Sequence, residues 1–152
     1  MAFKQPIEIL DPKDGEFRTY PEASGATFKR GELVQLSSGR VADLLGTDPA
    51  ANSILGIATH DASGTADSDV VVFVPSPDSL FVANLGGTSV TAATDRGAEY
   101  GLVEEANQVH VDKTDTTTTR VVVVDLDRRD PVGDTNGRVI FKFMASALDL
   151  SA

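Results

Sequence analysis

Side chains that could carry acid–base or nucleophilic chemistry are sparse in this sequence. It contains two histidines, His60 and His110, and no cysteine. A hydrolase or transferase needs a nucleophile, a base and a group that orients the base. Neither histidine stands in a metal-binding or nucleophile motif, and no glycine-rich phosphate loop precedes a helix pattern. Both lie within or at the end of strand patterns, so we expect packing or surface roles for them and no catalytic residue.

Clustered aspartates are the other residues that could carry chemistry, because their carboxylates can bind calcium. A hard cation needs about six to eight oxygen ligands from a folded loop. Arg128 and Arg129 interrupt the larger cluster, which also lacks the residue order of an EF-hand. Aspartates favour turns because their side chains bond to nearby backbone amides. We therefore expect turn roles, no metal site and no cofactor for the two clusters, which are Asp125, Asp127, Asp130 and Asp134, and Asp61, Asp67 and Asp69.

Length and charge narrow the class of protein. The 152 residues suit one domain with a hydrophobic core. A formal net charge of −10, with scattered basic residues, argues against nucleic acid as a partner, since phosphate binding needs clustered lysine and arginine. No apolar run is long enough to span a membrane, and the first residues lack a signal-peptide core. We expect a protein made in the cytoplasm with no nucleic-acid or membrane partner.

Strand patterns dominate the chain. Short runs rich in Val, Ile, Phe and Thr alternate with clusters of Gly, Pro, Asn, Asp and Ser, which is typical of an all-β fold. Residues 33–36 and 40–44 flank Ser37-Ser38-Gly39, which predicts a hairpin with Gly39 at a positive φ. The pattern predicts a small β-sandwich or barrel of β-tulip or jelly-roll type. Its further strands are expected over residues 54–60, 70–74, 80–85, 99–103, 108–112, 119–126 and 138–143.

Helix patterns are few. Residues 49–53 could form one turn, and residues 145–150 could form a short helix or a tail. The strand over 138–143 is expected to place Val139, Phe141 and Phe143 on one buried face. Because strand patterns run through the remainder of the chain and helix patterns are few, we expect residues 26–152 to form a single β domain.

The first 25 residues differ from the remainder. They carry three prolines and several charges. Ile7 and Ile9 alternate as in a strand, but Pro6 and Pro12 bracket them. One interpretation is an extended N-terminal arm over residues 1–25 that orders against a partner. The other is an edge strand or wrapped segment of the same domain. The candidate contact residues are Phe3, Ile7, Ile9 and Leu10.

Several segments resemble the small head-decoration (capsid cement) proteins of tailed bacteriophages, with a lambda-type core. The first part of the resemblance is Phe28-Lys29-Arg30-Gly31-Glu32-Leu33-Val34-Gln35-Leu36, followed by Gly39-Arg40-Val41 and Ile54-Leu55-Gly56-Ile57-Ala58. Residues 62–65 and 70–74 are similar to the next loop and strand. Longer cement proteins resemble the C-terminal part of the chain, over residues 119–124, 130–133 and 136–141. The resemblance therefore implies that residues 86–152 form an extension of that core.

The resemblance implies a protein without catalysis. Such proteins bind the outer surface of an icosahedral head, usually as homotrimers, and clamp neighbouring major capsid subunits. Phe3, Ile7, Ile9 and Leu10 would then contact the capsid. Two alternatives remain at this point: another virion β module, such as a tail-tube or fibre-associated domain, and a small head-associated hydrolase. The hydrolase would require a pocket that gathers His60 or His110 with a serine and a carboxylate.

Overall fold

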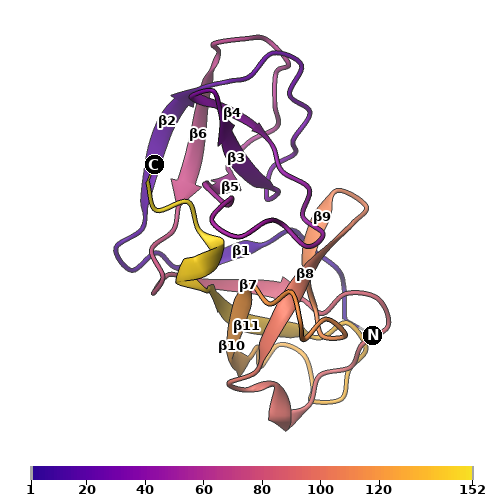
Figure 1. Ribbon diagram of the computed structural model, residues 1–152. Helices are drawn as coiled ribbons and strands as arrows, with labels where there is room; N and C mark the ends of the chain where they lie inside the picture. The colour runs from indigo at the N-terminus through magenta and orange to yellow at the C-terminus, as the bar shows by residue number, and fades with distance from the viewer. Residues whose placement is uncertain (1, 152) are drawn as a thin grey trace.

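The computed structural model describes residues 2–151, which form strands, connecting loops and two short 3-10 helices (Figure 1). The predicted all-β fold is confirmed. The strands are β1 (Glu8–Asp11), β2 (Glu16–Pro21), β3 (Leu33–Ser37), β4 (Arg40–Asp43), β5 (Gly56–Ala58), β6 (Asp69–Val74), β7 (Leu80–Asn84), β8 (Glu99–Glu105), β9 (Gln108–Asp112), β10 (Val121–Leu126) and β11 (Arg138–Phe143). The 3-10 helices are η1 (Ala93–Asp95) and η2 (Ala145–Ala147).

The strands form two antiparallel sheets. The six-stranded sheet has the order β1-β7-β11-β10-β8-β9, and the five-stranded sheet has the order β2-β6-β5-β3-β4. Figure 1 shows the five-stranded sheet in the upper part of the view and the six-stranded sheet in the lower part. Each sheet curls back on itself, because single parallel bridges join Glu22 to Val41 and Leu85 to Val111. The architecture is therefore a small sandwich of two strongly curved sheets.

Local turn chemistry explains the two shortest hairpins. In the β3–β4 hairpin, Ser38 and Gly39 have φ values of 51° and 77°, which confirms the predicted turn. In the β8–β9 hairpin, Ala106 and Asn107 have φ values of 51° and 63°. Positive φ at both central residues gives the turn the twist that an antiparallel pair requires.

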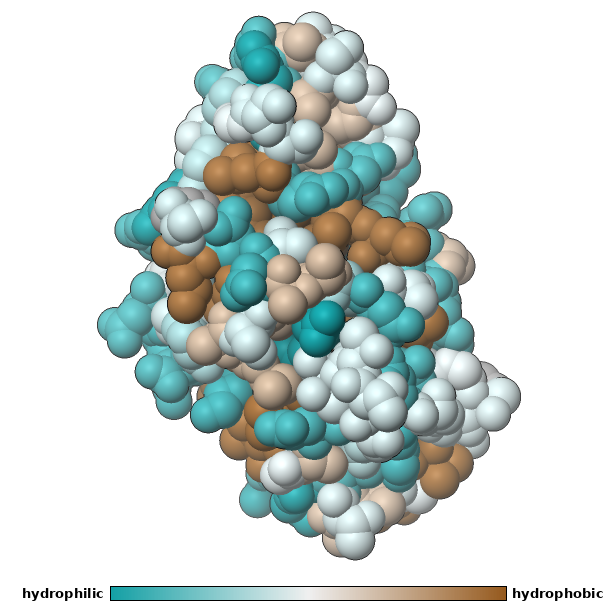
Figure 2. Space-filling model, in the orientation of Figure 1, coloured by the Kyte–Doolittle hydropathy of each residue, from teal (hydrophilic) through white to brown (hydrophobic). Residues whose placement is uncertain are grey.

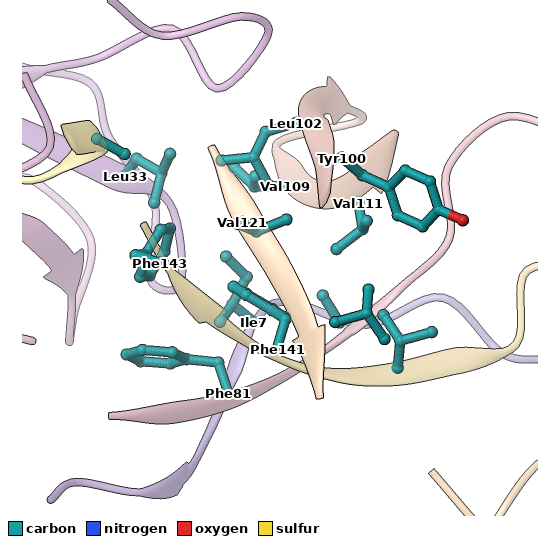
Figure 3. Close-up of a cluster of buried hydrophobic side chains, with 14 of the residues drawn as sticks. Ile7, Leu33, Phe81, Tyr100, Leu102, Val109, Val111, Val121, Phe141 and Phe143 are labelled. Carbon is teal, nitrogen blue, oxygen red and sulfur yellow. The ribbon is translucent and has the colours of Figure 1, made fainter. Parts of the chain in front are cut away.

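The main hydrophobic core lies between the sheets. Four rings stand at its centre, and Phe81 contacts Phe73, Phe141 and Phe143 with ring centroids 5.9, 5.7 and 5.1 Å away. Figure 3 shows Ile7, from the N-terminal segment, in this cluster together with Leu33 from β3. The predicted buried face of β11 is confirmed, since Val139, Phe141 and Phe143 are at most 1% exposed.

A second hydrophobic cluster covers the opposite face of the five-stranded sheet. It contains Phe28, Val34, Val41 and Val72. The neighbouring residues Leu33 and Val34 point to opposite faces of β3, and both are fully buried. The inner strands of the five-stranded sheet thus carry buried side chains on both faces, which explains the nearly continuous apolar run of β6.

For residues 1–25 the sequence left two interpretations, an extended arm and an edge strand or wrapped segment of the same domain. In the structure, β1 and β2 form one edge of each sheet. β1 pairs with β7, and β2 pairs with β6 over its whole length from Glu16 to Pro21. Ile7 is 7% exposed and belongs to the main core. In this structure the segment follows the second interpretation, an edge of the same domain, because burial of Ile7 and ladder hydrogen bonds hold it there.

Three shorter features complete the fold. The helix η2 lies within the segment expected to form a short helix or tail, and residues 51–52 form a turn. The helix η1 was not predicted.

In the part of the chain that the structure describes, no helix has the length and apolar character needed to cross a membrane.

Candidate partner-binding groove

A groove of about 690 Å³ lies between the N-terminal segment and the five-stranded sheet. One wall consists of residues 5–9, which lead into β1, and the other of residues 57–59, at β5 and just beyond it. Phe17 of β2 and Arg30 complete the lining. The groove is therefore an open, mostly apolar channel beside an edge strand, with one basic side chain, Arg30, and one acidic side chain, Glu8, on its lining.

Gly31 allows the N-terminal segment to form its wall of the groove. Its φ is +87°, and a Cβ at this position would lie 2.6 Å from the Cβ of Pro6. Its N–H donates a hydrogen bond to the carbonyl of Ala58 (2.8 Å). Any side chain here would collide with Pro6 and also strain the backbone, so glycine is required for this close approach.

Asn84 at the end of β7 holds the segment from the other side. Its Oδ1 accepts the backbone N–H of Gln5 (2.8 Å), and its Nδ2 donates to the carbonyls of Phe3 and Asn136 (both 2.9 Å). The side chain is fully buried. One amide thus supplies the donor and the acceptor that a neighbouring strand would offer to residues 3–5.

The structure separates the four predicted contact residues into two pairs. Ile7 and Ile9 line the groove, and Ile7 is also part of the core. Phe3 and Leu10 lie outside the groove lining and are 88% and 49% exposed. The β1–β7 register shifts between Ile9 and Asp11, which leaves Leu10 unpaired at a bulge. Phe3 and Leu10 are thus available to a partner without any change in the core.

Phe17 was not singled out from the sequence, although it is 61% exposed. Its ring meets that of Phe73 edge to face, with centroids 5.2 Å apart. Phe73 in turn contacts Phe81, so a series of rings runs from the groove into the core. The signal that could have revealed Phe17 is the alternation of residues 16–21, which fits a strand better than an arm.

The hydrophobic surface is divided into separate patches. Figure 2 shows several of them on one face of the molecule, each surrounded by polar side chains. The large exposed hydrophobic residues of the described chain are Phe3, Leu10, Phe17, Leu45, Val90, Val124, Val132 and Leu150. The first three fall within the first 17 residues, so exposed apolar side chains are concentrated in the N-terminal edge strands and the segment before them.

The histidines are engaged in structural hydrogen bonds. His110 is 1% exposed, and its Nδ1 lies 2.7 Å from Glu105 Oε1. His60 Nε2 accepts the backbone N–H of Val71 (3.2 Å), so its Nδ1 carries the proton and faces the carbonyl of Asp61 (3.0 Å). Between residues 2 and 151, neither imidazole is hydrogen-bonded to a serine. Neither histidine lines the groove described above.

The clustered aspartates pair with arginines and with turn amides. The carboxylate of Asp130 binds Arg138 through both oxygens, at 2.7 and 2.9 Å, which holds the pKa of Asp130 below its usual range. Asp127 accepts the backbone N–H of Arg129 (2.9 Å) and pairs with its guanidinium. No group of three or more possible ligands is arranged for a metal ion among residues 2–151.

The fold and this groove define an all-β protein with a candidate binding surface at a sheet edge. No protein-family model matches the chain, and no curated protein is significantly similar to it. The function must therefore be argued from the geometry of the chain itself.

Proposed function

We propose that this chain is a non-enzymatic decoration protein of a tailed-phage head. It would bind the outer surface of the capsid and stabilise it by joining neighbouring major capsid subunits. The observation that carries the proposal is the concentration of exposed apolar side chains in the N-terminal edge strands and the segment before them, where Phe3, Leu10 and Phe17 are 88%, 49% and 61% exposed. The resemblance of the β3–β5 region to cement proteins points in the same direction.

The edge position of β1 supports a specific binding mode. β1 is hydrogen-bonded to β7 and ends the six-stranded sheet, and its residues line the groove. An exposed edge can accept an extended peptide as an additional strand, with pockets that receive alternate side chains. An extended capsid segment would lie along β1, with its apolar side chains against Ile9 and Phe17.

Charge and assembly fit this role. A formal charge of −10 keeps the protein soluble and disfavours nucleic acid as a partner. The proposal includes a homotrimer on the head surface, because a second and third contact then form at high effective concentration. Each copy can bind weakly while the trimer binds tightly.

Binding of purified variants to undecorated heads tests the role of the edge surface. Leu10→Ser and Phe17→Ser remove exposed apolar side chains, and Val132→Ser, at a position 60% exposed on the β10–β11 loop, is the matched control. Burying one such side chain contributes about 1.5–3 kcal/mol. We expect each edge variant to weaken binding by about 10- to 100-fold in cosedimentation, while Val132→Ser binds like the unaltered protein. Equal binding by all three variants would contradict the proposed surface.

A further inference from the structure

Two carboxyl groups meet where the sheets join. Glu32 immediately precedes β3, and Glu104 belongs to β8 of the other sheet. Both line a hollow of about 250 Å³ that also includes Asp43 and Asn107. Glu32 is 8% exposed, and its Oε1 accepts the backbone N–H of Lys29 (3.0 Å). Two side chains that carry the same negative charge when ionised thus line one hollow at the junction of the two sheets.

The surroundings of this pair offer little compensation for two negative charges. Glu104 Oε1 is buried and accepts no hydrogen bond from the described residues. The hollow lining contains no basic side chain, and the nearby Asp43 carboxylate is already bonded to Thr27 and Phe28. Burial and the adjacent Glu104 raise the pKa of Glu32 to about 7. The Glu32 carboxyl is therefore protonated in about half of the molecules near pH 7 and in most of them at lower pH.

The neighbouring backbone links the sheets at the same place. The N–H of Glu104 donates to Thr47 Oγ1 (2.9 Å), and the N–H of Asp48 donates to the carbonyl of Leu102 (3.2 Å). Gly46 lies so close to β8 that a Cβ there would be 3.2 Å from the Cβ of Glu104. The loop over residues 44–48 is therefore packed directly against the strand that carries Glu104.

A second pair of acids includes one residue of this loop, Asp48. Asp48 faces Asp115, which raises the pKa of Asp48, with Asp112 adding to that effect and Arg120 opposing it. Asp48 is exposed, so solvent screens its interactions more than those of Glu32. The backbone N–H of Thr118 and the contact with Asp48 lower the pKa of Asp115, which opposes the effect of Asp48 on the pH dependence of stability.

We propose that Glu32 and Glu104 form a pH-dependent contact between the two sheets, closed while the Glu32 carboxyl is protonated and loosened when it ionises. The direction follows from linkage. Glu32 binds its proton more tightly in the folded protein, so its stabilising effect is complete below its ordinary pKa near 4.5 and is lost as pH rises through about 7. The loop over residues 44–48 should separate from β8 over this range. The inference is independent of the proposed capsid role.

Amide hydrogen exchange measured by NMR tests this contact. We expect the protection factors of the Glu104 and Asp48 amides, corrected for intrinsic rates, to fall between pH 5.5 and 8.5 by about tenfold to thirtyfold. Glu32→Gln and Glu104→Gln should abolish the change. Glu99→Gln, an exposed position on the same strand, is the matched control and should retain it.

Two results would overturn the proposal. One is equal protection at both pH values in the unaltered protein, and the other is an unchanged pH dependence in Glu32→Gln. If Glu104→Gln does not fold, the carbon-detected titration of the Glu32 carboxyl in the unaltered protein decides the question. A midpoint near 7 supports the contact, and a midpoint near 4.5 rejects it.

Discussion

Replacement of Ile7 by alanine tests whether the N-terminal segment belongs to the domain. Ile7 is 7% exposed and packs in the main core, although it precedes the first strand. Truncation of a buried isoleucine to alanine costs about 2–5 kcal/mol, and the lower part of this range applies where the structure can relax. Ile7 also lines the open groove, where its neighbours can relax, so we expect a loss of about 2–3 kcal/mol.

The assay is thermal unfolding followed by circular dichroism, with urea unfolding as a second measure. For a domain of this length, each kcal/mol shifts the midpoint by about 2–4 °C, so Ile7→Ala should lower it by about 4–12 °C. Phe3→Ala is the matched control, because Phe3 is 88% exposed and its loss should change stability by no more than about 0.5 kcal/mol. If Ile7→Ala is as stable as Phe3→Ala, the segment does not pack on the core, and the interpretation as a separate arm would be restored.

Three further changes test how the groove wall and the loops are held. Gly31→Ala should destabilise the protein by about 1–3 kcal/mol in urea unfolding, because it combines a positive φ with a collision at Pro6. Asn84→Ala should cost about 1–3 kcal/mol and speed amide exchange at Gln5, whose N–H loses its acceptor; unchanged exchange would contradict the proposed anchoring. Asp130→Asn should remove an acid-sensitive part of the stability. Because Arg138 lowers the folded-state pKa of Asp130, this contribution is present above the ordinary pKa near 3.9 and lost as pH falls below it. Melting curves from pH 2 to 6 would show a flatter acid limb for the variant.

Local sequence signals predicted the elements that depend on nearby residues. The β3–β4 hairpin was predicted because its turn lies between two strand patterns a few residues apart. The buried face of β11 followed from simple alternation. These features need no knowledge of distant contacts, which is why pattern and turn chemistry were sufficient.

Pairing between distant segments could not be predicted in this way. β7 lies between β1 and β11, and nothing in its own sequence specifies neighbours so far along the chain. The role of Asn84 depends on the same long-range arrangement, since it holds residues near the N-terminus. The contact between Glu32 and Glu104 likewise arises only when the two sheets meet. The burial of Ile7 depends on contacts with distant residues, and the prolines on either side of it, Pro6 and Pro12, favoured the interpretation as an arm.

Imaging of undecorated heads after incubation with the purified protein tests the proposed role most directly. The heads should come from the virus whose genome encodes the chain, in both immature and expanded forms. The proposal predicts saturable cosedimentation and added density at three-fold positions on the outer surface, with β1 and Phe17 toward the capsid. Absence of binding to both forms of the head, or binding to tails instead, would contradict it.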